Sequence, residues 1–221
     1  MLRRMIIKCK RSCWRWKLNN SWNRMIYKVW SLIYDRIFNS GIFLKARKRV
    51  FDGMSFKGDQ KILIVGVGTG ADIELLNLEN IEVTAIDLSY DMLRKARSKS
   101  SNSSIEFKQM DAQNLLFKDE SFDTIIASLI LSVVPDPEKS LTEMERVLKK
   151  HGRIIIFDKF APKEKQLPFT KKLIRPVVRM LGTDIGLHFE YIFQKVSDTL
   201  TIENDVPIML NGMYRKIVIR K

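Results

Sequence analysis

The chain has 221 residues and a mass of 25.9 kDa, enough for one well-buried α/β domain with a short extension but not for two full domains. Its composition, 45% hydrophobic and 29% charged, is that of a folded soluble protein, and no apolar run approaches the roughly 20 residues that a membrane-spanning helix needs. The formal net charge is +14, and because most of it lies at the N-terminus it implies an anionic partner there.

The positive charge is concentrated at the N-terminus. Residues 1–34 contain nine Lys or Arg and no acid, whereas the other residues hold 30 basic and 25 acidic side chains, a net of only +5. These cations interrupt any apolar stretch that a secretory signal needs, so we expect a cytoplasmic protein. The only cysteines, Cys9 and Cys13, lie there with no His nearby, which predicts reduced thiols and neither a disulfide framework nor a metal site.

An amphipathic helix is predicted near residues 22–38. Its apolar positions from Trp22 to Ile37 follow the i, i+3, i+4, i+7 spacing of one helix face, and all four tryptophans lie within the first 30 residues. Trp beside Lys and Arg suits the surface of an anionic membrane. A lid helix packed on the catalytic domain explains residues 22–38 equally well, but residues 2–17 are too cationic for a core. We therefore expect residues 1–40 to be a basic, Trp-rich helical segment that attaches the protein peripherally to a membrane.

From Lys61 onward, short apolar runs alternate with helical stretches, which is typical of a parallel sheet built from βαβ units. The predicted strands are Lys61–Val65, Val83–Asp87, Ile105–Met110, Phe122–Ser128 and Arg153–Asp158. The predicted helices are Ala71–Leu78, Tyr90–Lys99 and Pro137–Lys150, the last ending at a C-cap formed by His151 and Gly152.

The chain after Phe160 has a different character. Residues 161–198 are rich in Lys and Arg, which predicts a helical insertion that faces the substrate or the membrane. Two closing strands, Leu200–Glu203 and Tyr214–Arg220, are joined through Asn211 and Gly212, a turn signal. Residues 41–221 are thus expected to form a single α/β domain.

A glycine-rich turn follows the first predicted strand. Residues 66–71 read Gly-Val-Gly-Thr-Gly-Ala, and their glycines let the backbone approach a ligand closely at the carboxyl edge of the sheet. Asp87 ends the second strand, where it can accept hydrogen bonds from ribose hydroxyls or instead cap the next helix. Both features also fit the dinucleotide fingerprint, so they do not choose between an adenosyl and a nicotinamide cofactor.

The third strand leads into Met110-Asp111-Ala112, and here the chain resembles the class I methyltransferases. Phe122–Ser128 with its exit to Pro137, and the turn at Leu148–Ile154, resemble later motifs of that family, although Lys150 and His151 replace the usual Pro and first Gly. The resemblance spans residues 58–160 and implies S-adenosylmethionine as cofactor, with Asp111 pairing with the adenine amino group. It implies a Rossmann-like α/β fold, with a mostly parallel seven-stranded sheet and a C-terminal antiparallel hairpin. The implied cofactor-binding residues are Tyr34, Gly66, Gly68, Gly70, Asp87, Leu88, Met92, Asp111, Ala112 and Ser128.

The flanking segments resemble a narrower group. Tyr34-Asp35 before the first strand, and Phe157–Phe160, Leu181–Ile185 and Phe189-Glu190 after the fifth, look like bacterial phospholipid N-methyltransferases, which methylate phosphatidylethanolamine at the membrane surface. Quinone-biosynthesis C-methyltransferases share the Tyr-Asp entrance, so a quinone precursor is the alternative acceptor. RNA is a third candidate because of the basic N-terminus. No Asn-Pro-Pro-Tyr-like motif is present and helically spaced Trp favours lipid, so no nucleic-acid partner is expected.

Catalysis of methyl transfer needs a neutral nucleophile held close to the methyl group, so no nucleophilic residue is required. We expect Tyr34 to close over the cofactor or orient the amine and His188 to accept its proton, unless these residues only pack in the fold. A cationic cluster can hold a lipid phosphate or form a solvated helix face. Its members are Lys171, Lys172, Arg175 and Arg179.

Overall fold

The computed structural model describes residues 40–100, 104–161, 183, 185–196 and 199–221. Its strands are β1 Lys61–Val65, β2 Glu82–Asp87, β3 Ile105–Gln109, β4 Phe122–Ser128, β5 Leu148–Lys159, β6 Thr201–Met209 and β7 Tyr214–Arg220. Its helices are α3 Gly41–Phe51, α4 Tyr90–Lys99, α5 Pro137–Val147, α7 Phe189–Val196 and the short 3-10 helix η1 Ile73–Leu75.

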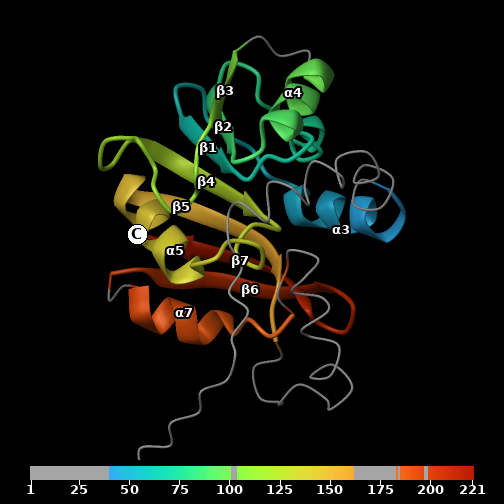
Figure 1. Cartoon of the computed structure of the whole chain (residues 1–221), viewed down its shortest axis with the longest axis vertical. Coiled ribbons are helices and arrows are strands. Elements are labelled where there is room, and N and C mark those ends of the chain that lie inside the picture. Colours follow the sequence, from blue (N-terminus) through green and yellow to red (C-terminus); the bar gives the residue numbers. More distant parts are fainter. Residues whose placement is uncertain (1–39, 101–103, 162–182, 184, 197–198) are drawn as a thin grey trace, which may run out of the picture.

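The strands form one seven-stranded sheet in the order β3-β2-β1-β4-β5-β7-β6 (Figure 1). The first five strands are parallel to one another, whereas β7 is antiparallel to both β5 and β6. The predicted α/β fold and its C-terminal antiparallel hairpin are therefore confirmed. The strand order reverses between β1 and β4, and open sheets of this kind bind ligands outside the carboxyl ends of the strands at such a point.

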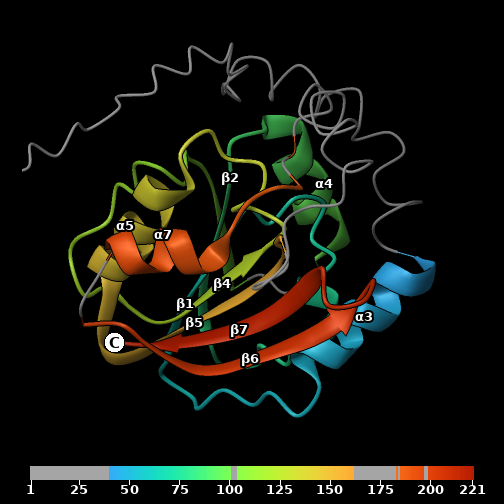
Figure 2. The ribbon, with the colours of Figure 1, turned by 90° about the horizontal axis from the view of Figure 1, so that it is seen from below.

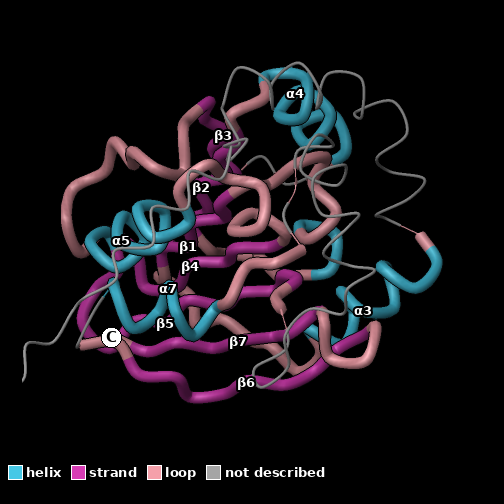
Figure 3. Tube along the Cα trace, turned by 60° about the horizontal axis from the view of Figure 1, so that its bottom comes forward, coloured by secondary structure: helices cyan, strands magenta, loops and turns pink. Residues whose placement is uncertain are grey.

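Helices cover both faces of the sheet, as the ribbon in Figure 2 and the tube in Figure 3 show. The face bearing Ile62 and Ile64 of β1 packs against α3 and α4, while Leu63 and Val65 belong to the core under α5 and α7. Side chains alternate between the faces of a strand, and a central parallel strand is buried on both, so an unbroken apolar run such as residues 62–65 is the expected pattern.

The predicted helix at Ala71–Leu78 is wrong, because only η1 forms there. Asp72 is occupied by a buried ion pair with Arg47 of α3, Leu76 has extended backbone, and the Asn77 side chain accepts the N–H of Glu79 at 3.3 Å. Polar side chains that bond locally in this way favour turns over a helix.

The predicted end of α5 is also wrong. The helix stops at Val147, and His151 and Gly152 lie inside β5 instead of capping a helix. The helix ends early because the chain from Val147 onward pairs with the backbone at the start of β4. The N–H of Ser121 donates to the Val147 carbonyl oxygen at 2.8 Å, and Phe122 pairs with Leu148 in the sheet. A Cβ on Gly152 would lie 2.9 Å from the Asp123 carbonyl oxygen, so glycine serves close strand packing here.

β6 is longer than predicted, since it continues past Glu203 to Met209 through Pro207. Proline lacks an N–H donor and is tolerated in a strand at the edge of a sheet, which is where β6 lies. The predicted turn is confirmed: Asn211 and Gly212 both have positive φ between β6 and β7.

The predicted N-terminal amphipathic helix and most of the predicted 161–198 insertion lie outside the described residues. The division into residues 1–40 and 41–221 therefore stays a prediction. Among the residues that the structure describes, none of the helices is long and apolar enough to cross a bilayer.

Candidate functional site

The carboxyl ends of β1, β2, β3 and β4 meet at one edge of the sheet, because these strands are parallel neighbours. They bring together the start of the glycine loop at Gly66, the carboxylate of Asp87, Asp111 beyond β3, and Ser128. Four separately predicted cofactor residues therefore lie at one edge of the fold, the position where open α/β sheets bind ligands.

The glycine loop, residues 66–71, requires its glycines. Gly66, Gly68 and Gly70 have φ of 71°, 55° and 87°, in the left-handed region where a side chain is strained. A Cβ on Gly66 would lie 2.8 Å from Cδ1 of Ile130, and one on Gly70 would lie 3.1 Å from the α-carbon of Ala96 in α4. The loop is thus bounded by the segment after β4 and by α4, with no room for side chains there.

Asp87 connects the end of β2 to the glycine loop. Its carboxylate accepts the N–H of Gly68 at 2.9 Å on one oxygen and the N–H of Ser89 at 2.8 Å on the other. Ser89, not Asp87, caps α4, because its hydroxyl accepts the N–H of Met92. Burial raises the pKa of Asp87, against the opposing effect of these N–H donors. Each carboxylate oxygen has a second lone pair, so the group can still accept bonds from ribose hydroxyls.

Asp111 is oriented by a buried residue that the sequence analysis missed, Gln113. One oxygen of Asp111 accepts the backbone N–H of Gln113 at 2.9 Å and its side-chain amide at 3.0 Å. The side-chain oxygen Oε1 of Gln113 in turn accepts the N–H of Asp136, the N-cap of α5, at 2.9 Å. Gln113 therefore ties the expected adenine contact to the start of α5. Only spatial proximity reveals this role, since a lone Gln carries no sequence signal.

The buried hydroxyl of Ser128 indicates whether this edge of the sheet fits a ligand. Its hydroxyl is buried at the end of β4 and has no hydrogen-bond partner within the described part of the chain. Buried hydroxyls are normally bonded, so a donor or acceptor from a bound molecule is expected beside it. Together with the positive-φ glycines of the loop and the Asp87 carboxylate, this fits an adenosyl cofactor.

The other predicted cofactor residues adjoin this edge. Leu88 offers its carbonyl oxygen to the Gln109 side-chain amide at 3.0 Å, while Met92 and Ala112 are buried. His188 is exposed and its carbonyl accepts the N–H of Ile192, so it opens the first turn of α7 and its role as a base stays a prediction. The remaining predicted residues lie outside the described residues. They are Tyr34, Lys171, Lys172, Arg175 and Arg179.

Comparisons with known proteins agree with this geometry. The family model described as a methyltransferase domain matches residues 63–156. The chain is 34% identical over 194 residues to the phosphatidylethanolamine N-methyltransferase of Cereibacter sphaeroides, covering 85% of this chain and 92% of that relative. It is 34% identical over 186 residues to the demethylmenaquinone methyltransferase of Thermotoga maritima, covering 80% of each. A solved SAM-dependent methyltransferase from Thermotoga maritima shares the fold, with a TM-score of 0.66 at 20% identity over 89% of this chain and 99% of that one.

Proposed function

Because the chain belongs to the class I S-adenosylmethionine-dependent methyltransferases, we propose that it methylates the amine of a phospholipid headgroup such as that of phosphatidylethanolamine. The observation that carries the proposal is the similarity to the Cereibacter phosphatidylethanolamine N-methyltransferase. That similarity extends over almost the whole relative and well beyond the residues that the methyltransferase family model matches. It therefore includes segments outside the cofactor half, where acceptor specificity is expected.

The cofactor, S-adenosylmethionine, fits the carboxyl edge of β1 to β4. In this arrangement Asp87 accepts hydrogen bonds from the ribose hydroxyls, Asp111 accepts one from the adenine amino group, and the glycine loop lets the backbone approach the amino-acid part. When bound, the cofactor supplies a methyl group on a positively charged sulfur, which a neutral amine accepts by in-line displacement. The protein's own contribution is to hold the acceptor in line and to exclude water.

An ammonium headgroup must lose a proton before its nitrogen can attack. His188 is the proposed proton acceptor, because a neutral imidazole has an unprotonated ring nitrogen that can accept a proton. Its exposed position before α7 leaves it open to solvent, to which the proton can pass. Tyr34 is proposed to orient the amine or to close over the cofactor.

A membrane surface is the proposed location of the reaction. The basic, Trp-rich residues 1–40 supply cations and interfacial aromatic side chains. Lys171, Arg175 and Arg179 are proposed to hold the lipid phosphate, since guanidinium groups pair well with phosphate oxygens. Such an enzyme is cytoplasmic and peripherally attached to the anionic leaflet.

A quinone precursor is the second candidate acceptor, favoured by the similarity to the Thermotoga demethylmenaquinone methyltransferase, which also covers most of both chains. The two acceptors differ chemically in a useful way, because only the phospholipid offers a phosphate.

The test incubates the full-length protein with radiolabelled S-adenosylmethionine and, separately, vesicles containing phosphatidylethanolamine or a demethylated quinone. Label in the lipid headgroup supports the proposal, and label only in the quinone contradicts it. On the lipid, Arg175→Ala and Arg179→Ala should raise KM with little change in kcat if they bind the phosphate. If neither changes KM, the phosphate binds elsewhere.

A further inference from the structure

The segment that follows β4, residues 129–134, forms a tight turn beside the glycine loop. Leu129 donates its N–H to the Phe157 carbonyl at 2.7 Å, and the N–H groups of Val133 and Val134 both bond to the Ile130 carbonyl at 3.0 and 3.1 Å. The side chain of Ile130 occupies the space that a Cβ on Gly66 would need. This post-β4 turn therefore forms one wall of the cofactor site.

A buried carboxylate, that of Asp158 in β5, holds the turn by a hydrogen bond. The Asp158 side chain is completely buried, and one of its oxygens accepts the N–H of Ser132 at 3.0 Å. The other oxygen accepts the N–H of Lys159 at 2.7 Å. Strand alternation directs Asp158 to the same face as Ile156 and Phe160, under α5 and α7. Burial raises the pKa of Asp158, which Lys159 and the Ser132 donors oppose.

Ser132 also connects the turn to the segment before α7. The hydroxyl of Thr183 donates to the Ser132 carbonyl oxygen at 3.3 Å and lies 3.4 Å from its hydroxyl. Ser132 thus joins three parts of the chain: the exit of β4, the end of β5, and residue 183. Burying a carboxylate is costly unless it is hydrogen-bonded, so both oxygens of Asp158 need their donors. Of these bonds, the one to Ser132 reaches the post-β4 turn, whereas the other goes to the neighbouring Lys159, so Asp158 can act on the site through Ser132.

We propose that Asp158 is a positioning residue for methyl transfer, which keeps the post-β4 turn against the glycine loop by holding the backbone of Ser132. Loss of this bond frees Ile130 to move away from Gly66, and this wall of the cofactor site, against which the reacting groups must be aligned, is no longer fixed. Misplacement of reacting groups by about 1 Å can cost roughly a hundredfold in rate, so kcat is the quantity most affected. The proposal rests on methyl transfer and is independent of the identity of the acceptor.

Asp158→Leu and Asp158→Asn are the test variants. Leucine is similar in size but accepts no hydrogen bond, while asparagine keeps one acceptor oxygen. Asp123→Leu and Asp123→Asn are the comparison variants, because Asp123 also accepts a backbone N–H, that of Lys61 at 2.9 Å, but at the amino end of β4. Unlike Asp158, Asp123 is partly exposed and is ion-paired with Lys149. A loss of general stability would affect both pairs, whereas loss of the turn would affect only the Asp158 pair.

The first measurement is amide hydrogen exchange in the full-length protein without acceptor. We expect peptides covering residues 129–134 to exchange at least about tenfold faster in Asp158→Leu, with Asp158→Asn intermediate and both Asp123 variants like wild type. Exchange at wild-type rates in Asp158→Leu would overturn the proposal. If the leucine variant does not fold, the asparagine variant decides by the same criterion.

The second measurement is single-turnover methyl transfer together with calorimetric binding of S-adenosylhomocysteine. The proposal predicts a fall of about 10- to 100-fold in the transfer rate of Asp158→Leu and a much smaller change in cofactor affinity. Equal losses in the Asp158 and Asp123 variants would reduce Asp158 to a stability role and reject the proposal. If phosphatidylethanolamine is not methylated at all, the headgroup assignment fails. The role of Asp158 is still tested by hydrogen exchange, which needs no acceptor.

Discussion

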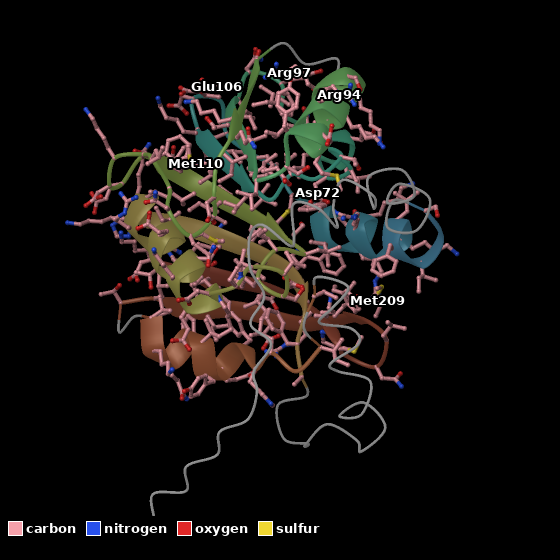
Figure 4. The ribbon with its side chains drawn as sticks, viewed as in Figure 1. Asp72, Arg94, Arg97, Glu106, Met110 and Met209 are labelled. Carbon is pink, nitrogen blue, oxygen red and sulfur yellow. The ribbon has the colours of Figure 1, made fainter. Side chains whose placement is uncertain are left out.

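Arg47 of α3 and Asp72, two residues beyond Gly70, form an ion pair in which each residue is only 4% exposed. The pair lies where the glycine loop turns into η1, since Ile73 donates its N–H to the Gly70 carbonyl at 3.1 Å; Figure 4 marks Asp72 beside α3. Neither charge reaches water, so each depends on the other for compensation. The helix that follows the N-terminal segment is thereby fastened to the cofactor loop.

Replacing Arg47 with Met should destabilise the protein strongly, by about 3–5 kcal/mol, because Asp72 is left as an uncompensated buried charge. Urea unfolding measures this loss. Lys61→Met is the control, since its ion pair with Glu82 is exposed and its removal should be hard to detect. The double variant Arg47→Met, Asp72→Leu should recover much of the stability. An Arg47 variant as stable as the Lys61 variant would contradict the importance of the pair.

Gly66→Ala should abolish most cofactor binding. Gly53 has a similar φ, 67° against 71°, but a Cβ there would meet nothing within 4 Å, whereas at Gly66 it would collide with Ile130. Both substitutions should cost about 1–2 kcal/mol of stability through backbone strain, and Gly66→Ala should cost more because of the collision with Ile130. Only Gly66→Ala should lose affinity for S-adenosylhomocysteine in calorimetry. Equal affinities for the two variants would show that the loop does not approach the ligand.

Asp87→Ala should weaken binding of both S-adenosylmethionine and S-adenosylhomocysteine by about 10- to 100-fold, because the ribose hydroxyls lose a charged acceptor worth roughly 1.5–3 kcal/mol. Glu82→Ala, at the exposed amino end of the same strand, should bind normally. The ribose assignment fails if titration calorimetry gives the two variants the same affinity.

Acidification should release the cofactor before an ordinary aspartate would titrate. Burial raises the pKa of Asp87 above its ordinary value of 3.8, so the folded state favours the protonated carboxyl. The stability that the protonated carboxyl contributes is fully present at low pH and is lost as the pH rises through the raised pKa. Ligand binding needs the ionised form, so affinity falls as the pH is lowered through that value. Calorimetry between about pH 4 and 7, with circular dichroism as a folding control, measures this effect. Asp87→Asn should remove the pH dependence.

Deleting residues 1–20 should weaken binding to anionic vesicles and make the remaining binding less sensitive to salt. Each cation near such a surface adds about 1 kcal/mol of attraction, and this segment carries seven Lys or Arg. Co-sedimentation with anionic vesicles and with purely zwitterionic vesicles measures the binding of the full-length and the truncated protein. Equal affinity with and without the segment would favour a helix that only covers the catalytic domain.

Much of the fold was predictable because its signals are local. β1, β4 and β7 begin and end at the predicted residues, since apolar runs bounded by turn residues depend only on neighbours in the chain. Gly66, Asp87 and Asp111 could be assigned for the same reason: each follows its own strand, and parallel strands bring their carboxyl ends together.

The sequence alone thus determined the seven strands of the described sheet, though not where β5 begins or where β6 ends, together with the glycine loop and the order of the cofactor residues. Tertiary structure decided which side chains support them. Arg47 meets Asp72 across 25 residues and Asp158 meets Ser132 across 26. No periodicity encodes such pairs, because their contact depends on how elements pack across the sheet. The same packing overrode local preference after Val147, where a neighbouring strand ended helical structure that the residues themselves would favour. At Ala71–Leu78 an ion pair across the fold and locally bonded polar side chains both act against a helix.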